Sequence, residues 1–313
     1  MEKIKPSFIK MIRAPFLSSI YAPLIAGTLI AVIASGQFYI LNFFLILVIG
    51  TGLHIATNVY NDIYDTLQGT DKVNVHRNEF SGGSGVLLDQ PQLISTLYLI
   101  ARSSLVIAFI ATVVLTFLID RELWPLFWTL YVVSAFLSKY YTAAPVKLAY
   151  RGFGEIFVWF AFGPMAILIA SLGQNLGFHP YVLSVMALTG LSTLSILLIG
   201  QLIDLDADRR GGKFGIAVRH GTRFTGWFYF IVQLIIVVNI IIAAILIIQN
   251  GWPILLALIP YALLFPRAFK IIREHHSQPR ELVRAAGLNV QIHLFFSLFF
   301  NVGLGITLLL NSL

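Results

Sequence analysis

The sequence contains no cysteine and few charged residues. The absence of cysteine from all 313 residues excludes disulfide bonds, thiolate metal ligands and cysteine nucleophiles. Asp, Glu, Lys and Arg make up only 11% of the chain, whereas a soluble globular protein has about 25%. Hydrophobic residues make up 58%, and the mean hydropathy is +0.85. We therefore expect an integral membrane protein that lies in the lipid bilayer.

Nine apolar segments have the length of a membrane-spanning helix, which is about 20 residues. The segment 123–138 is the shortest of them. Neither a low-complexity stretch nor a separate soluble region interrupts the series, which predicts a single domain over residues 1–313. We expect an all-α, polytopic membrane protein in which nine transmembrane helices form a bundle around a central cavity. The segments lie at 14–35, 38–60, 92–118, 123–138, 152–172, 180–203, 225–249, 252–269 and 286–311.

The basic residues predict the orientation of this bundle. If nine helices cross in alternation, 20 of the 21 Lys and Arg fall on the same side as the N-terminus, and only Arg121 falls on the other side. Because cytoplasmic loops carry an excess of Lys and Arg, we expect the N-terminus to face the cytoplasm and the C-terminus to face outward. The same loop cations account for the net charge of +7, so nucleic acid is not an expected partner.

Two short acidic motifs stand at the ends of apolar segments. In the first, residues 58–71 (NVYNDIYDTLQGTD), the spacing of Asn58, Asp62 and Asp65 is i, i+4, i+7, and Asn61 precedes Asp65 by one turn. A helix that continued out of the apolar segment would present these side chains on one face. In the second motif, residues 204–213 (DLDADRRGGK), two aspartates are again one turn apart.

The composition of these motifs favours a hard cation. They hold six of the 14 acidic residues, and an ionised Asp beside a membrane segment is costly unless it is paired, hydrated or bound to metal. Oxygen ligands without His or Cys favour Mg²⁺, which proteins bind through one or two carboxylates together with substrate phosphates. The sequence therefore predicts Mg²⁺ between the two motifs and a phosphorylated lipid as the ligand.

Basic and glycine-rich segments on the same side fit an anionic ligand. Lys72 and Lys213 are the cations nearest to the acidic motifs in sequence, and Arg77 and Lys139 lie in neighbouring loops; such cations bind diphosphate oxygens. The glycine-rich loop 80–86 (FSGGSGV) could approach a phosphate with its N–H groups or could act as a flexible lid. Tyr141, in the segment 139–147 (KYYTAAPVK), adds a hydroxyl group beside the same site.

Two further titratable residues lie near the motifs. His54 precedes Asn58 by one turn, and we expect it to be a hydrogen-bonded interior residue rather than a ligand. Glu155 is the acid outside the motifs that could enter the cavity, although it could equally pair with Arg151.

The two motifs also suggest an internal repeat. Each follows an apolar segment, and each leads into a loop with glycine and a basic residue, Gly69 to Lys72 in one case and Gly211 to Lys213 in the other. Duplication of a four-helix unit would produce this pattern. We therefore expect two four-helix pseudo-repeats that are closed by a ninth helix.

The motifs Asn61-Asp62-x-x-Asp65 and Asp204-x-x-x-Asp208, in a nine-helix frame, resemble those of the UbiA-type intramembrane aromatic prenyltransferases, and the resemblance covers essentially the whole chain. In the common family pattern a third acid follows Asp65 by four residues. This chain has Gly69 there and Asp71 two residues later. That variant, with Tyr141-Thr142-x-x-Pro145 and Gly212-Lys213, is most similar to the 1,4-dihydroxy-2-naphthoate polyprenyltransferases of menaquinone synthesis.

The resemblance implies Mg²⁺-dependent transfer of a polyprenyl group from its diphosphate to an aromatic acceptor. It implies four catalytic aspartates, a larger set of metal ligands, and side chains that contact the prenyl diphosphate. The catalytic residues would be Asp62, Asp65, Asp204 and Asp208. The metal ligands would be these four with Asn61 and Asp71, and the diphosphate-binding residues would be Asn58, Asn61, Lys72, Arg77, Lys139, Tyr141 and Lys213.

Other functions stay open at this point. The acceptor could be 4-hydroxybenzoate, homogentisate, haem or a glycerolipid, because the tail-binding and acceptor-binding helices carry no local motif. A divalent-cation transporter would also use such acids, but it would place them near the middle of the bilayer. The signature of CDP-alcohol phosphotransferases, Asp-Gly-x-x-Ala-Arg, is missing after Asp62 and Asp65. The oligomeric state is not predicted.

Overall fold

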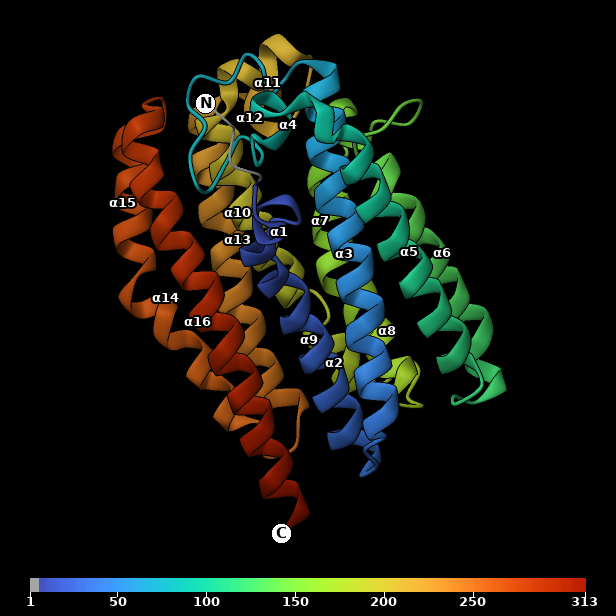
Figure 1. The fold of residues 1–313 in the computed structure, drawn as a ribbon. Helices are drawn as coiled ribbons and strands as arrows, with labels where there is room; N and C mark the ends of the chain where they lie inside the picture. Colours follow the sequence, from blue (N-terminus) through green and yellow to red (C-terminus); the bar gives the residue numbers. More distant parts are fainter. Residues whose placement is uncertain (1–5) are drawn as a thin grey trace.

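The computed structural model describes residues 6–313, which form helices and connecting loops without a β-strand. Figure 1 shows the helices running along one common direction in an elongated bundle. The α-helices are α1 (Phe8–Met11), α2 (Ser18–Ser35), α3 (Ile40–Gln68), α4 (Val86–Asp89), α5 (Ile94–Thr116), α6 (Trp124–Tyr140), α7 (Gly154–Phe160), α8 (Ala166–Gly173), α9 (Pro180–Val185), α10 (Leu188–Ile203), α11 (Leu205–Gly211), α12 (Ile216–His220), α13 (Thr222–Ile242), α14 (Ile259–Leu263), α15 (Phe265–His275) and α16 (Pro279–Ser312). Short 3₁₀ segments lie at Ala14–Leu17, Pro91–Leu93, Arg121–Leu123, Leu148–Arg151 and Trp252–Leu258, and π-helical turns lie at Ala161–Met165 and Ala243–Ile247.

Eight helical segments within the described residues are long and apolar enough to cross a membrane. This finding confirms an all-helical membrane protein, but it does not confirm the expected count of nine. The segment expected at 123–138 folds as α6, which has 17 residues and is not among the eight. The eight segments are Ala14–Ser35, Ile40–Gln68, Pro91–Thr116, Gly154–Gly173, Pro180–Ile203, Thr222–Ile247, Trp252–His275 and Pro279–Ser312.

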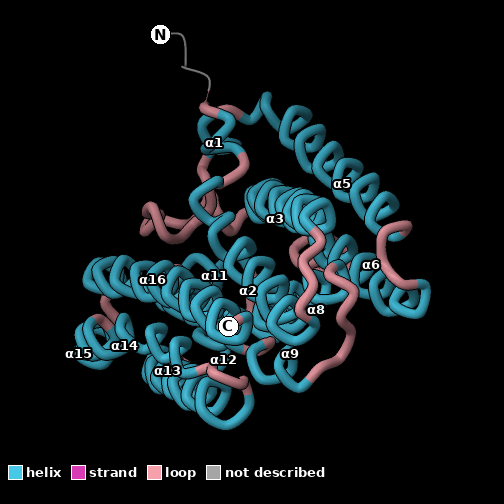
Figure 2. Tube along the Cα trace, turned by 90° about the horizontal axis from the view of Figure 1, so that it is seen from below, coloured by secondary structure: helices cyan, strands magenta, loops and turns pink. Residues whose placement is uncertain are grey.

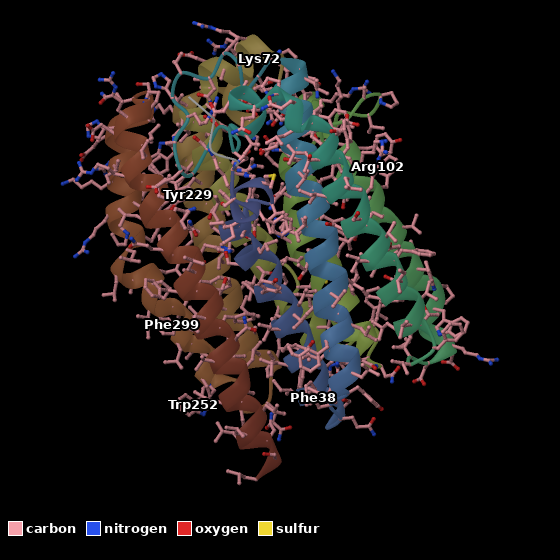
Figure 3. All side chains as sticks on the ribbon, in the orientation of Figure 1. Phe38, Lys72, Arg102, Tyr229, Trp252 and Phe299 are labelled. Atoms are coloured by element: carbon pink, nitrogen blue, oxygen red, sulfur yellow. The ribbon has the colours of Figure 1, made fainter. Side chains whose placement is uncertain are left out.

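The outer helices lie on two opposite sides of the bundle. Viewed along the bundle, α5 and α6 lie outside α3, while α13, α14, α15 and α16 lie on the opposite side (Figure 2). The loop after α3 lies beside α11 and α12 at one end of the bundle, and the C-terminus lies at the other end (Figure 1). Lys72 projects at the former end, whereas Phe38 and Trp252 lie toward the latter (Figure 3). Both acidic motifs therefore share one end of the molecule.

Glycines let the helices approach closely. At Gly190, an added Cβ would lie 2.0 Å from the Trp159 carbonyl oxygen and 2.9 Å from the Gly163 backbone nitrogen. The chain at 161–165 forms a π-helical turn that contains Pro164, because proline lacks the N–H group that a regular α-helix requires at this point. Close packing of small residues and such turns are common where membrane helices contact one another.

Buried polar side chains connect the helices away from the acidic motifs. His293 of α16 is 1% exposed, and its ring nitrogens lie 3.3 Å from Ser19 Oγ and 2.9 Å from Ser192 Oγ. Asn289, one turn earlier, accepts hydrogen bonds from Tyr229 and Gln233. Lipid offers no partner for polar groups, so such bonds between helices stabilise the packing.

Candidate active site

A cavity of about 220 Å³ lies between the two acidic motifs. The helix α3 contributes the first motif, and the turn between α10 and α11, with α11 itself, contributes the second. Residues of the loop 69–86 line the cavity at the end of the bundle. The polar residues of the motifs that line it are Asn58, Asn61, Asp65, Thr70, Asp71, Asp204, Asp208 and Lys213.

The first motif is helical through Gln68, as the spacing predicts. Asn58, Asp62 and Asp65 are each at most 8% exposed, and Asn58 donates a hydrogen bond of 3.2 Å to the Ile12 carbonyl. Asp62 lies behind the wall of the cavity, where it accepts a hydrogen bond of 3.1 Å from the Ser84 N–H and lies 3.7 Å from Arg13 Nη1. The aspartate of this helix that faces the cavity most directly is therefore Asp65.

Asp65 connects the two motifs. Its Oδ2 accepts a hydrogen bond of 3.0 Å from Lys213 Nζ, and its Oδ1 accepts one of 2.6 Å from the Tyr150 hydroxyl. Burial opposes the charge of the Lys213 ammonium group, but the carboxylates of Asp65 and Asp208 raise the pKa of Lys213 well above its ordinary value. A positive charge is thereby held in the cavity, 148 positions along the chain from its partner.

The helix end explains how Asp71 reaches the cavity. Gly69 ends α3 in the left-handed conformation, with φ +91°, which a residue with a Cβ adopts only at a cost. The chain then turns back, and Asp71, 4% exposed, accepts a hydrogen bond of 3.3 Å from Thr66 Oγ1. Burial first, and then the charges of Asp65 and Asp62, raise the pKa of Asp71 to about 7.

The second motif places two further carboxyl groups in the same cavity. Asp204 is the C-cap residue of α10, and its Oδ1 accepts a hydrogen bond of 2.8 Å from Asn74 Nδ2. Asp208, one turn later, is 5% exposed. Burial raises the pKa of both groups, to about 7 for Asp208. Gly212, with φ +72°, ends α11 as Gly69 ends α3, and Lys213 follows directly.

The glycine-rich loop packs on the first motif. The Ser84 N–H binds Asp62, and a Cβ on Gly83 would lie 2.7 Å from Asp71 Oδ2. Gly83 has φ +73°, so both its conformation and its surroundings favour glycine. The loop therefore covers the carboxyl groups from the end of the bundle.

The structure brings some of the expected diphosphate-binding residues into the cavity and leaves others outside. Tyr141 and Lys213 line it. Arg77 lines an adjoining groove and donates a hydrogen bond of 3.3 Å to the Asp71 carbonyl. Lys72 is exposed and Lys139 stacks over the Tyr140 ring at 5.2 Å, and neither lines the cavity. Loops between membrane helices also carry Lys and Arg that set topology, so closeness in sequence to the acids does not by itself bring a cation to them.

Several residues of the site were not identified from the sequence. Arg13 lines the cavity with a side chain that is 16% exposed, in a left-handed conformation with φ 54°. Tyr150 and Asn74 bind Asp65 and Asp204. Among these three residues, only Arg13 had a recognisable feature in the sequence, which was its position directly before an apolar segment. Glu155 does not enter the cavity, because it binds Gln201, the Ile216 N–H and Arg219 instead.

The oxygen atoms present suit Mg²⁺ shared with a substrate. Asn61 Oδ1 is buried and has no hydrogen-bond partner among the described residues, and carboxyl oxygens from both motifs line the same cavity. The part of the chain that the structure describes has no group of three or more His, Asp or Glu that could hold a metal ion alone. This arrangement fits the usual Mg²⁺ site, in which one or two carboxylates act together with phosphate oxygens.

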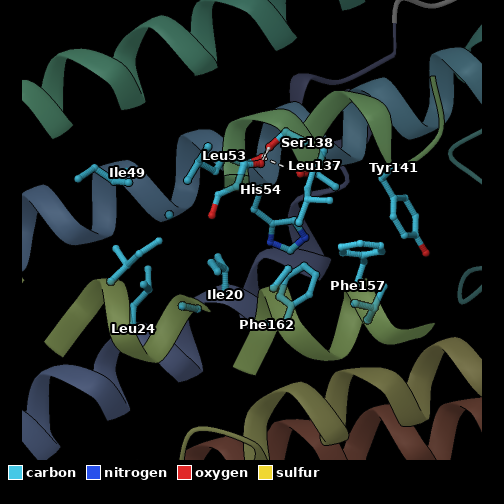
Figure 4. Close-up of a pocket in the computed structure, with 17 residues that line it drawn as sticks. Ile20, Leu24, Ile49, Leu53, His54, Leu137, Ser138, Tyr141, Phe157 and Phe162 are labelled. Carbon is cyan, nitrogen blue, oxygen red and sulfur yellow. Dashed lines mark hydrogen bonds between the residues drawn. The ribbon is translucent and has the colours of Figure 1, made fainter. Parts of the chain in front are cut away.

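A second cavity, of about 90 Å³, lies deeper in the bundle. Apolar side chains such as Leu24, Ile49 and Leu137 make up most of its wall (Figure 4). A set of five residues lines both cavities and forms a junction between the polar and the apolar space. These junction residues are His54, Thr57, Tyr141, Val158 and Phe162.

Comparison with known proteins identifies relatives over most of the chain. A profile of the UbiA prenyltransferase family matches residues 20–299. The 2-carboxy-1,4-naphthoquinone phytyltransferase of Synechocystis sp. is 26% identical over 305 residues, which cover 95% of this chain and 92% of that protein. The 1,4-dihydroxy-2-naphthoate octaprenyltransferase of Mycobacterium tuberculosis is 30% identical over 213 residues, 68% of this chain and 69% of that protein.

Solved structures share the fold. A UbiA homologue from Archaeoglobus fulgidus superposes with a TM-score of 0.66 at 12% identity, covering 95% of this chain and 99% of that chain. The same protein bound to DMAPP and Mg²⁺ gives a TM-score of 0.60 at 11% identity, covering 95% and 100%. At this identity the similarity establishes the fold alone.

Proposed function

The chain belongs to the UbiA prenyltransferase family, and we propose that this prenyltransferase transfers a polyprenyl group from its diphosphate to an aromatic acceptor with Mg²⁺ as cofactor. The observation that supports this most is the single cavity lined by carboxyl groups of both motifs and by Lys213. A prenyl diphosphate combines an anionic head with an apolar tail, and the polar cavity adjoins an apolar one. The bound homologue adds support, since it holds DMAPP and Mg²⁺.

We propose that 1,4-dihydroxy-2-naphthoate is the acceptor. The support is the set of curated relatives, several of which are naphthoate or naphthoquinone prenyltransferases. In the reaction, the diphosphate would leave with the electron pair of the bond to the allylic carbon. The ring carbon that bears the carboxylate would then bond to that carbon, and the carboxylate would be lost as carbon dioxide. Such a reaction is the prenylation step of menaquinone synthesis.

The residues of the chain would supply charge compensation and exclusion of water. When bound, Mg²⁺ would neutralise negative charge on the leaving diphosphate. Lys213 and Arg13 would add positive charge where the diphosphate leaves. The loop around Gly83 and Ser84, which covers the carboxyl groups, would keep water from the allylic cation, which water would otherwise quench. Asp62 binds Ser84 and Arg13, and it would therefore hold the loop and the Arg13 side chain in place.

One experiment separates this function from cation transport. Purified protein is reconstituted in liposomes whose lumen holds Mg²⁺ and a fluorescent Mg²⁺ indicator. Prenyl diphosphate and an aromatic acid are then added, and diphosphate release and indicator fluorescence are measured. A prenyltransferase releases diphosphate only when both substrates are present, and it produces no metal flux. Mg²⁺ flux without release of diphosphate would support the transporter instead.

We further propose that α6 is a ninth crossing, that two four-helix units are repeated, and that the acidic motifs face the cytoplasm. The matching left-handed glycine caps, Gly69 and Gly212, support the repeat. The absence of cysteine from the sequence permits a clean topology test. Lys72→Cys and Lys147→Cys should react with an impermeant maleimide only from the cytoplasmic side, and Arg121→Cys only from the outside. Labelling of residues 121 and 147 from the same side would exclude the crossing by α6.

A further inference from the structure

The junction between the two cavities contains a histidine whose hydrogen bonding is incomplete. His54 lies on α3, is 6% exposed, and its Nδ1 has no hydrogen-bond partner among the described residues. Its ring meets that of Phe162 edge-on, with the centroids 4.9 Å apart, and it points into the apolar cavity among Leu137, Phe157 and Phe162 (Figure 4). A buried polar atom without a partner costs free energy, so the atom is expected to have a partner in a complex.

The other buried histidine in the bundle provides a contrast. Both ring nitrogens of His293 contact serine hydroxyls, and this residue lines neither cavity. His293 therefore has the bonding expected of an interior histidine that joins helices. His54 instead places a nitrogen without a partner at the boundary of the space in which the substrates would meet.

The position of His54 along α3 relates it to the acidic motif. His54 precedes Asn61 by seven residues, which is about 10 Å along the axis of a helix. The diphosphate would occupy the end nearer to Asn61, and the prenyl tail would extend away from it into the apolar cavity. The junction is then beside the first carbons of the prenyl group, where the acceptor ring must approach.

The other junction residues suit a flat ring with a polar substituent. Tyr141 and Phe162 supply aromatic side chains, and Val158 supplies an aliphatic one. Thr57 donates its hydroxyl hydrogen to the Leu53 carbonyl at 2.8 Å, so that its oxygen can still accept a hydrogen bond. A neutral imidazole nitrogen can either donate or accept, depending on the tautomer.

We propose that His54 binds a ring hydroxyl group of the aromatic acceptor and thereby positions the acceptor ring at the junction. This inference rests on the proposed prenyl transfer to an aromatic acceptor, and it adds the residue that recognises that acceptor. His54 is a binding residue in this account, whereas the prenyl diphosphate is held by the acidic motifs. Its loss should therefore affect the two substrates differently.

The test compares two variants of His54 with a matched variant of His293. His54→Phe keeps a ring but removes both nitrogens, and His54→Asn restores a polar atom near the position of Nδ1. We expect His54→Phe to raise KM for the acceptor roughly 10-fold, the effect of one lost hydrogen bond in a buried site, while KM for prenyl diphosphate stays within about 2-fold. His54→Asn should recover most of the loss, and His293→Phe should lower Tm without changing KM for the acceptor.

A second readout does not depend on turnover. In wild-type protein labelled with ¹⁵N-histidine, the His54 signal, assigned from its absence in His54→Asn, should shift when acceptor is added, and the His293 signal should not. An unchanged acceptor KM in His54→Phe with an unshifted His54 signal would overturn the inference and leave prenyl transfer intact. A rise in KM for prenyl diphosphate instead would assign His54 to the tail and also overturn it. Failure of the wild-type protein to prenylate any aromatic acceptor would overturn the proposed function itself.

Discussion

Lys213 Nζ donates a hydrogen bond of 3.0 Å to Asp65 Oδ2, although the two residues are 148 positions apart. Lys213 follows the glycine that ends α11, and Asp65 lies one turn before the glycine that ends α3. The contact therefore joins the two acidic motifs. Without a bound substrate, this lysine neutralises part of the charge of the aspartates, and a diphosphate would compete for the same ammonium group.

The aspartates that line the cavity should be required for activity. We expect Asp65→Asn and Asp208→Asn each to lower kcat by roughly 10²-fold or more, because a lost charge in the site weakens stabilisation of the leaving group. Asp206→Asn is the matched control, since Asp206 belongs to the same motif but is exposed and does not line the cavity. The measurement is product formation by protein that elutes as wild type in size-exclusion chromatography. Wild-type turnover in Asp65→Asn would contradict the assignment.

Asp71 should replace the third acid of the common family pattern. Asp71 is buried in the same cavity. We expect Asp71→Asn to raise the Mg²⁺ concentration that gives half-maximal activity by roughly 10-fold, because one charged ligand is lost. Asp89→Asn, at the exposed end of α4, should leave the titration unchanged. The same Mg²⁺ titration curve for Asp71→Asn and wild type would exclude Asp71 from the metal site.

Binding of Mg²⁺ should depend on pH near neutrality. Burial raises the pKa of Asp71 and of Asp208 to about 7, so both carboxyl groups are largely protonated at pH 6 and ionised at pH 8. A cation must displace these protons in order to bind. We therefore expect the affinity for Mg²⁺ to rise between pH 6 and pH 8, with release of protons measurable by calorimetry in buffers of different ionisation enthalpy. An affinity that falls over this interval would have the wrong sign.

Close helix packing at Gly190 should be needed for stability. An added methyl group would meet the Trp159 carbonyl, so we expect Gly190→Ala to destabilise the protein by roughly 1–3 kcal/mol, as overpacking does. The change should be seen as a lower Tm in detergent. Gly305→Ala is the control, because nothing lies within 4 Å of the added atom. An equal Tm for both variants would show that the helices can separate at Gly190 without cost.

Patterns within short stretches of the sequence predicted the membrane helices and the helical first motif. The length of the apolar runs predicted the membrane helices, and the i, i+4, i+7 spacing predicted the buried face of α3 with Asn58, Asp62 and Asp65. The family resemblance was confirmed by the profile match. The apolar segment was expected to end at residue 60, and α3 continues beyond it through the polar residues to Gln68, as the spacing of the first motif predicts.

Contacts between distant segments could not be predicted. Arg13, which has a left-handed conformation in the chain before α2, lies 3.7 Å from Asp62 across 49 positions of the chain. Tyr150 reaches Asp65 across 85 positions. No spacing rule connects such residues, since their proximity arises from packing of whole helices. His54 was expected to be a hydrogen-bonded interior residue. It is buried, but its Nδ1 has no partner among the described residues, because the space beside it is a cavity.

The most direct test of the central claim is the identity of the product. Purified protein is incubated with geranylgeranyl diphosphate, Mg²⁺ and 1,4-dihydroxy-2-naphthoate, and in parallel with 4-hydroxybenzoate, and the products are analysed by mass spectrometry. We predict a prenylated naphthoquinol that has lost carbon dioxide, formed only when Mg²⁺ is present. Prenylation of 4-hydroxybenzoate alone would contradict the proposed acceptor, and the absence of any prenylated product would contradict the claim that this chain transfers a prenyl group to an aromatic ring.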